Sequence, residues 1–333
     1  MIFRILSGLA LACALAGGAA MGQEKPKQDG PKVSGGEREM AQKIEKAKGT
    51  EAKLQAAAAF VKKYPQSPLR GQIADGIARE IAETTDQQAK GSLAQTFLEI
   101  FNLPGEAPLV NASLLNSYIN TGQTQDAMTL GTKWLAEHPD DISVMQNLTI
   151  LASGQAIKGN NAFIAQGRDY GAKAIALLEA DKMPAGADAA KWADFKKSAL
   201  VSLYRETGIL AFKANDNAAA IPLLEKAVEL NSPDAAVYFL LSDLQNDIYE
   251  DRAKRAIVAS AADKPAATQK AEAALDKVID SYARAIAFTD GKPEFAQANA
   301  AFRERITPYY KYRHKNSTDG LQQLIDKYKK PAQ

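Results

Sequence analysis

Residues 201–234 read VSLYRETGILAFKANDNAAAIPLLEKAVELNSPD, and the spacing inside this stretch decides the fold class. Tyr204 and Gly208 place an aromatic and a small residue four positions apart. Tyr238 and Ser242 repeat that pair 34 residues later. A period of this length is typical of a helix hairpin used as a repeating unit. The stretch therefore predicts antiparallel helix pairs that stack one on the next.

Small and large residues recur along the second half of this unit. Ala220, Leu224 and Ala227 follow one another at spacings of four and three, which is one face of a helix. A small residue such as Gly208 lets two helix backbones approach closely, and a large residue fills the adjacent hole. We expect these residues to lie where two helices cross.

Residues 108–141 have the same layout. The matching positions are Leu114, Tyr118, Gly122, Ala127 and Pro139, with Leu115 where a small residue is usual. Both stretches resemble repeats of the tetratricopeptide superfamily, and weaker matches extend over most of residues 38–330. The resemblance implies an all-α fold, a right-handed superhelical solenoid of antiparallel helix pairs.

Short clusters containing Pro, Gly, Asn or Asp divide the helical segments, at 64–67, 103–105, 138–141, 183–186, 231–233 and 291–293. An Ala/Lys/Asp-rich insert at 249–270 predicts lengthened helices joined by an exposed loop. Residues 321–330 are amphipathic and predict a helix that caps the array, because an open last hairpin would expose its apolar face. We therefore place the solenoid at 38–330.

The first 22 residues have the layout of a secretory signal peptide. Arg4 supplies a positive charge, residues 5–16 form a short apolar run, and residues 17–22 are mostly small. We expect cleavage after Gly22, with Ala16 and Ala20 as alternative sites. The layout predicts an exported bacterial protein, and we expect it in the periplasm.

Cys13 and residues 23–37 bear on how the N-terminal part of the chain is processed and ordered. Cys13, the only cysteine, lies in the apolar run, and a lipoprotein anchored through it is a minor alternative. Residues 23–37 are polar and rich in Pro and Gly, which predicts a flexible linker because they cannot bury enough apolar surface to offset the entropy of ordering.

Residues 60–67, FVKKYPQS, resemble the end of the second helix in tetratricopeptide proteins of the bacterial envelope, such as outer-membrane assembly lipoproteins and Tol–Pal coordinators. Trp134 stands five residues before Pro139, just as Phe60 stands five before Pro65. The recurrence indicates a common structural unit and does not identify a partner.

The motifs of common enzyme classes are missing from the sequence. It contains no Gly-rich phosphate loop, HExxH, CxxC or GxSxG motif, and no Glu-Ser dipeptide. Its two histidines, His138 and His314, are far apart in the sequence. The net charge of +2 falls to +1 without Arg4, which does not favour a nucleic-acid binder. We predict no enzyme activity, no cofactor, no metal site and no nucleic-acid partner.

The first helix of each pair carries the candidate binding residues. The resemblance implies that the inner face of the solenoid contacts ligand through residues that correspond to Asn116, Asn120, Arg205, Ile209, Phe212 and Lys213. Arg205 and Lys213 could hold a carboxylate or an acidic peptide by charge-assisted hydrogen bonds. The alternative interpretation is an ordinary solvated helix face.

A second candidate surface lies near the C-terminus. Tyr310, Tyr312 and Arg313 belong to a strip over residues 303–330 whose net charge is +5. Basic residues interleaved with aromatic ones could meet a glycan or an anionic lipid. The alternative is that the tyrosines pack the last helices while Lys and Arg stems cover apolar surface.

These observations predict a non-enzymatic scaffold of the cell envelope that binds a protein or peptide partner on the concave face of the solenoid. The alternatives are an accessory protein that binds a cell-wall glycan or a small molecule, and a structural subunit of an outer-membrane assembly. We expect a monomer.

Overall fold

The computed structural model describes residues 33–183, 188–232 and 234–329, and within these ranges the chain is helical with no strand. The prediction of an all-α fold is confirmed. The predicted signal peptide, Cys13 and residues 23–32 of the predicted linker lie outside the described residues.

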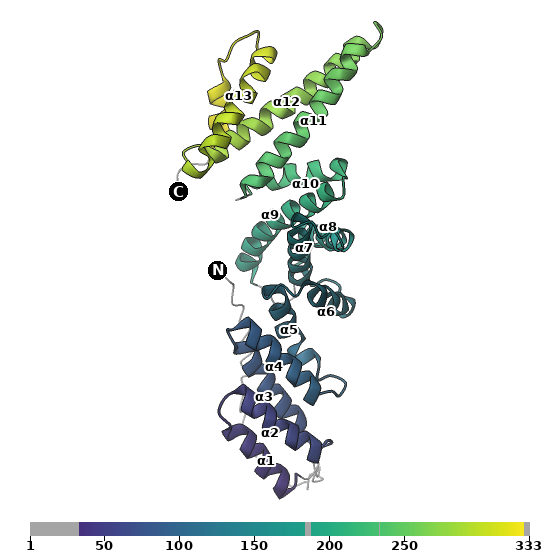
Figure 1. Cartoon of the computed structure of the whole chain (residues 1–333), viewed down its shortest axis with the longest axis vertical. Helices are drawn as coiled ribbons and strands as arrows, with labels where there is room; N and C mark the ends of the chain where they lie inside the picture. Colours follow the sequence, from purple (N-terminus) through teal and green to yellow (C-terminus); the bar gives the residue numbers. More distant parts are fainter. Residues whose placement is uncertain (1–32, 184–187, 233, 330–333) are drawn as a thin grey trace, which may run out of the picture. The chain divides into compact units, whose positions relative to one another are not determined.

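The chain divides into two compact units, Met1–Ile73 and Ala74–Gln333, with the boundary inside α3. The helices in chain order are α1 (Gly35–Lys46), α2 (Thr50–Lys63), α3 (Arg70–Glu83), α4 (Gln87–Ile100), α5 (Pro108–Asn120), α6 (Thr124–Glu137), α7 (Ile142–Ile157), α8 (Ile164–Glu179), α9 (Ala189–Lys213), α10 (Asn217–Glu229), α11 (Ala235–Val258), α12 (Lys264–Thr289), the short 3-10 helix η1 (Pro293–Phe295), α13 (Ala296–Arg313) and α14 (Leu321–Tyr328) (Figure 1).

In the first unit α1 packs against α2, and its start differs from the sequence prediction. The Ser34 hydroxyl accepts a hydrogen bond from the Glu37 backbone N–H, while the Glu37 carboxylate accepts one from the Ser34 N–H at 2.7 Å. This capping box satisfies two backbone donors that helix formation would leave unpaired. Helix α1 therefore begins at Gly35, and the last residues of the range predicted as flexible, 23–37, are ordered.

In the second unit each α-helix from α4 to α12 packs against the next α-helix in the sequence. Helix α7 also packs against α9, and α12 packs against α14. The unit is thus a series of stacked helix pairs, the architecture of tetratricopeptide-like arrays. The right-handed twist stays a prediction.

The crossing of α9 and α10 confirms the role expected for small residues. A Cβ atom added to Gly208 would stand 2.9 Å from Leu224 Cδ2, so these two helices can approach only because Gly208 lacks a side chain. Ala220, Leu224 and Ala227 of α10 are completely buried. Ser242, the residue 34 positions after Gly208, is also buried.

Four of the described helices end on a pair of aromatic rings four residues apart. The pairs are Phe60–Tyr64, Phe97–Phe101, Trp134–His138 and Tyr310–His314, with ring centroids 5.7, 4.6, 4.2 and 3.8 Å apart. In each, the backbone N–H of the second residue donates to the carbonyl of the first, which closes the last turn. The ring contact covers the helix end just before the chain turns.

The last hairpins are held by long helices and a short cap. Helices α11 and α12, of 24 and 26 residues, are joined by the exposed residues 259–263, inside the range where an insert was expected. Helix α14 packs on α12 through the buried Ile325, and the Arg284 guanidinium lies 4.1 Å from the centre of the Tyr328 ring.

Candidate functional site

The face formed by α9, α11 and η1 is hollowed on both sides of Arg205. One hollow, of about 350 Å³, lies along the first half of α9. The other, of about 570 Å³, lies between Arg205, the start of α11 and Phe295 of η1. Because Arg205 lines both hollows, we treat them as one surface, the Arg205 groove, made of Asp194, Lys197, Ser198, Val201, Ser202, Arg205, Leu230, Asn231, Asp234, Ala235, Ala236, Phe239 and Phe295.

The lining of this groove follows from helix periodicity. Asp194, Ser198, Val201 and Arg205 recur at spacings of four, three and four, so they form one stripe along α9. Ser198 and Asp194 are exposed, whereas Val201 and Arg205 are partly buried. The stripe therefore offers one partly buried apolar side chain, Val201, between polar and charged ones.

The opposite side of the groove is aromatic. Phe239 of α11 meets Phe295 edge to face, with ring centroids 6.2 Å apart and an interplanar angle of 87°. Phe239 also contacts the buried Phe302, with centroids 5.0 Å apart. Both groove rings remain partly exposed, so they can accept an apolar side chain without rearrangement of the core.

Arg205 itself is ion-paired. Its Nε donates to Glu206 Oε1 at 2.9 Å, and its Nη1 lies 3.4 Å from Asp234 Oδ2. Asp234 also caps α11, since its side chain accepts from the Ala236 N–H at 2.9 Å. An acidic ligand would have to compete with both carboxylates for the guanidinium. The expected use of Arg205 as a free cation for an acidic peptide therefore does not fit this geometry.

The other residues expected on α9 lie elsewhere. Ile209 is buried, Phe212 packs against the core, and Lys213 is partly buried at the end of the helix. Helix α9 packs against α7, α8 and α10, and within it only residues between Asp194 and Arg205 line the groove.

The asparagines expected on α5 are exposed. Asn120 Nδ2 donates to the Asn116 carbonyl at 2.7 Å, within the same helix. Neither residue lines the Arg205 groove or the other hollows described here. They form a solvated face.

The C-terminal cluster mostly packs. Tyr310 is buried, its ring stacks on His314 at 3.8 Å, and its hydroxyl donates to the Asp319 carbonyl. Arg313 forms ion pairs with Glu272 at 3.1 Å and Asp276 at 2.7 Å, which hold α13 against α12. Only Tyr312 of the three expected binding residues is open to solvent, with 65% of its surface exposed.

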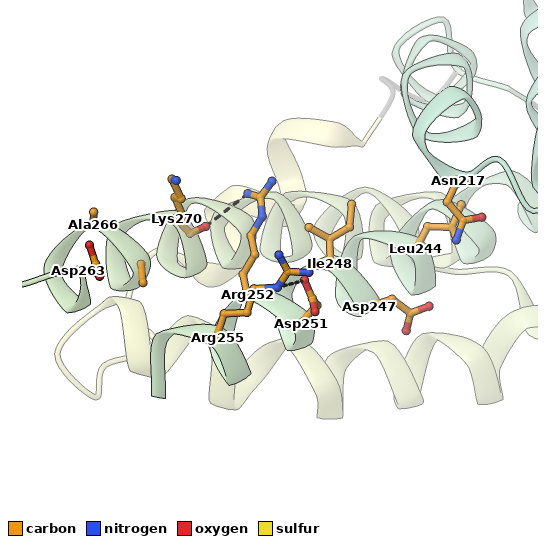
Figure 2. A pocket seen from close by; sticks show the side chains of 11 residues that line it. Asn217, Leu244, Asp247, Ile248, Asp251, Arg252, Arg255, Asp263, Ala266 and Lys270 are labelled. Carbon is orange, nitrogen blue, oxygen red and sulfur yellow. Dashed lines mark hydrogen bonds and ion pairs between the residues drawn. The ribbon is translucent and has the colours of Figure 1, made fainter. Parts of the chain in front are cut away.

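A larger hollow of about 690 Å³ lies where α11 and α12 extend past α10 (Figure 2). Leu244 and Ile248 supply apolar surface, and Arg252 reaches across to donate to the Lys270 carbonyl at 3.4 Å. Its six charged side chains balance in sign, namely Asp247, Asp251, Asp263, Arg252, Arg255 and Lys270. Arg255 pairs with Asp251 at 2.9 Å, and charges of both signs in equal number do not select one class of ligand for this hollow.

Residues 33–183, 188–232 and 234–329 bring together no three His, Cys, Asp or Glu side chains that could hold a metal ion. Among the helices in these ranges, none combines the length and the apolar character needed to cross a bilayer.

Comparison with known proteins finds a likeness only among solved structures. No family model matches the chain, and no curated protein matches it. Among solved structures it is similar to a tetratricopeptide repeat protein from Parabacteroides merdae ATCC 43184, with 13% sequence identity over 87% of this chain and 95% of that one, at a TM-score of 0.35. A likeness at this level carries no argument about a site or a partner.

Proposed function

We propose that the protein is a non-enzymatic, exported scaffold that binds a protein or peptide partner in the Arg205 groove. The observation that carries the proposal is the lining of the groove. Val201, Leu230, Phe239 and Phe295 provide apolar contact surface, and Ser198, Ser202 and Asn231 provide uncharged polar groups beside it. An extended peptide needs both, since its side chains seek apolar pockets and its backbone needs hydrogen-bond partners.

The charges refine the class of partner. Arg205 is paired with Glu206 and Asp234. The lining of the groove holds two cations, Lys197 and Arg205, and two carboxylates, Asp194 and Asp234, so it has no excess of positive charge. We therefore propose a partner segment with one or two apolar anchors rather than an acidic one. Burial of such anchors is the main source of affinity in peptide grooves.

Photo-crosslinking in cells tests the function. A photoreactive amino acid at the exposed Ala236, in the groove, should give a discrete crosslinked product, because a bound segment would lie against it. The matched control is the exposed Ala172 on α8, a second helix of its pair. Equal product at both positions, or none at Ala236, would overturn the proposal.

Export and periplasmic location are supported by the sequence of residues 1–22. Mass spectrometry of the mature N-terminus should begin at Gln23, and cell fractionation should recover the chain with periplasmic markers. A diacylglycerol on Cys13 would instead establish the lipoprotein alternative. An unprocessed Met1 in the cytoplasmic fraction would contradict export.

A glycan or lipid site at the C-terminus has less support. Two of its three residues, Tyr310 and Arg313, are committed to contacts within the protein.

A further inference from the structure

The hairpin of α11 and α12 ends in an exposed apolar tip. Ile257 and Val258 close α11 with 75% and 82% of their surfaces exposed. The connecting residues 259–263 are small or polar and mostly open to solvent. Two adjacent aliphatic side chains therefore stand open to solvent at the end of the hairpin.

The tip projects beyond its neighbours. Helix α13 reaches α11 through the contact of Tyr309 with Tyr249, and it reaches α12 through the pairing of Arg313 with Glu272. The nine residues of α11 after Tyr249 extend the helix by about 13 Å. Figure 1 shows the two helices running on together past α10 to this end.

Basic residues outnumber acidic ones next to the tip. From Arg252 to Lys264 the chain carries four basic residues and one acidic one, Asp263, and two further acids, Glu250 and Asp251, come just before this stretch. Lys254 and Arg255 form pairs with Glu250 and Asp251 one turn further from the tip, but their side chains are 78% and 76% exposed. Such exposed pairs are weak and can yield to another anion.

We propose that this tip docks on an anionic phospholipid surface, with Ile257 and Val258 inserted among the acyl chains and the surrounding Lys and Arg on the headgroups. Aliphatic residues insert into the interface while long basic side chains stay at the headgroup level. The charge complementarity selects anionic lipid. A protein partner fits less well, because a stable interface needs about 800 Å² from each side and two aliphatic side chains supply a small part of that.

Flotation of the purified protein with vesicles tests the proposal. At low ionic strength it should bind vesicles of equal parts phosphatidylglycerol and phosphatidylcholine. It should not bind vesicles made of phosphatidylcholine only. The double variant Ile257→Ser and Val258→Ser should lower partitioning at least roughly tenfold, since the removed apolar surface no longer enters the bilayer. Lys254→Gln and Lys264→Gln should each lower it roughly fivefold, and added salt should do the same.

The matched control is Ile157→Ser with Lys158→Gln at the end of α7, where an aliphatic residue 57% exposed also stands beside an exposed lysine. It should partition like wild type, and helical circular dichroism should be the same for all variants. Absence of binding to the anionic vesicles, or equal binding by the Ser variant, would overturn the proposal. If light scattering shows that the wild type is a dimer and the Ser variant a monomer, the tip contacts a second copy instead, which would also overturn the proposal.

Discussion

Gly171 of α8 is the described glycine at which an added Cβ would come closest to a neighbouring atom. A Cβ there would overlap the Thr207 hydroxyl and stand 3.1 Å from Thr149 Cγ2, and both threonines are buried. We expect Gly171→Ala to lower the free energy of unfolding by about 1–3 kcal/mol, because α7 and α9 would both have to shift. Urea unfolding measures the change.

Gly154 provides the control for this prediction. It lies inside α7, and a Cβ added to it meets no atom within 4 Å. Gly154→Ala should therefore stabilise the protein by about 0.5–1 kcal/mol through helix propensity alone. If the two alanine variants have the same free energy of unfolding, the close approach of helices at Gly171 does not depend on the absence of a side chain.

Tyr238 links stability to alkaline pH. Burial raises the pKa of its hydroxyl to about 12, and the hydroxyl donates to the Ser232 carbonyl at 3.2 Å. An unfolded tyrosine has a pKa of about 10, so the folded state holds this proton more tightly. Its contribution to stability should be constant below about pH 10 and decline as the pH rises toward about 12.

Unfolding by urea at a series of alkaline pH values measures this effect. In wild type the unfolding free energy should fall above about pH 10, and in Tyr238→Phe it should fall less steeply. Parallel pH dependences for the two proteins would contradict the assignment to Tyr238. Burial also raises the pKa of Tyr204, whose hydroxyl donates to Glu179, so part of the decline should remain in the variant.

Arg205 shows why a residue's type alone does not give its role. The sequence predicts a cation on a ligand-facing helix. Its neighbour Glu206 lies in the same helix, and its second partner Asp234 is placed beside it only by the packing of the next hairpin. Removing one member of a largely buried pair leaves an unpaired charge. A variant such as Arg205→Glu would therefore disturb folding as well as binding, and the groove is better tested at its exposed lining.

At the scale of the element, Trp134 connects the end of one helix to the start of the next. Its Nε1 donates to Asp141 Oδ2 at 2.9 Å, and Asp141 Oδ1 accepts from the Val144 N–H to cap α7. Trp134→Phe keeps the ring over His138 but loses the indole donor. We expect a loss of about 1 kcal/mol in unfolding free energy, because the hydrogen bond is to a charged, partly exposed group.

The companion variant is Asp141→Asn, which keeps an N-cap acceptor but loses the charge. If Trp134 acts through Asp141, the double variant should cost less than the sum of the two single changes, which denaturant titration of all four proteins can resolve. Strict additivity would show that the two side chains act independently.

Helix boundaries could be predicted in part. The clusters at 64–67, 103–105 and 138–141 fall between helices, because proline and turn residues act locally. The predicted boundary between linker and helix, after residue 37, lies too late, since α1 begins at Gly35. The reason is that Ser34 and Glu37 form a capping box inside a stretch dominated by Gly and polar residues. Local composition suggested disorder, and a specific pair of hydrogen bonds outweighed it.

At the scale of the whole molecule, the packing of neighbouring helices determines which face of α9 is accessible. Gly208 and the buried residues of α10 were predictable, since a 34-residue repeat fixes which positions cross. The burial of Ile209 was not, because it depends on α7, α8 and α10 enclosing the second half of α9. Because of this packing, the accessible stripe of α9 lies at residues 194–205. The spacing of three and four in that stripe is visible in the sequence, but nothing in the sequence marks these residues as ligand-binding.

The packing of the C-terminal cluster also required the full fold. Tyr310 finds its partner in the Asp319 carbonyl beyond the end of α13, and Arg313 finds its carboxylates on α12. A count of charges over residues 303–330 includes the basic residues but leaves out the acidic residues of other helices that pair with them.

The affinity of selected peptides for the groove tests the central claim most directly. Peptides selected from a random library on the wild-type protein are titrated by fluorescence anisotropy against two double variants. Ser198→Arg with Ala236→Arg obstructs the groove at two exposed positions, and Ser92→Arg with Ala172→Arg makes the same changes on the second helices α4 and α8. We predict apolar-anchored peptides that bind wild type and the α4/α8 variant equally and lose at least about tenfold in affinity for the groove variant. Peptides that bind all three proteins equally, or a library that yields none, would contradict the account.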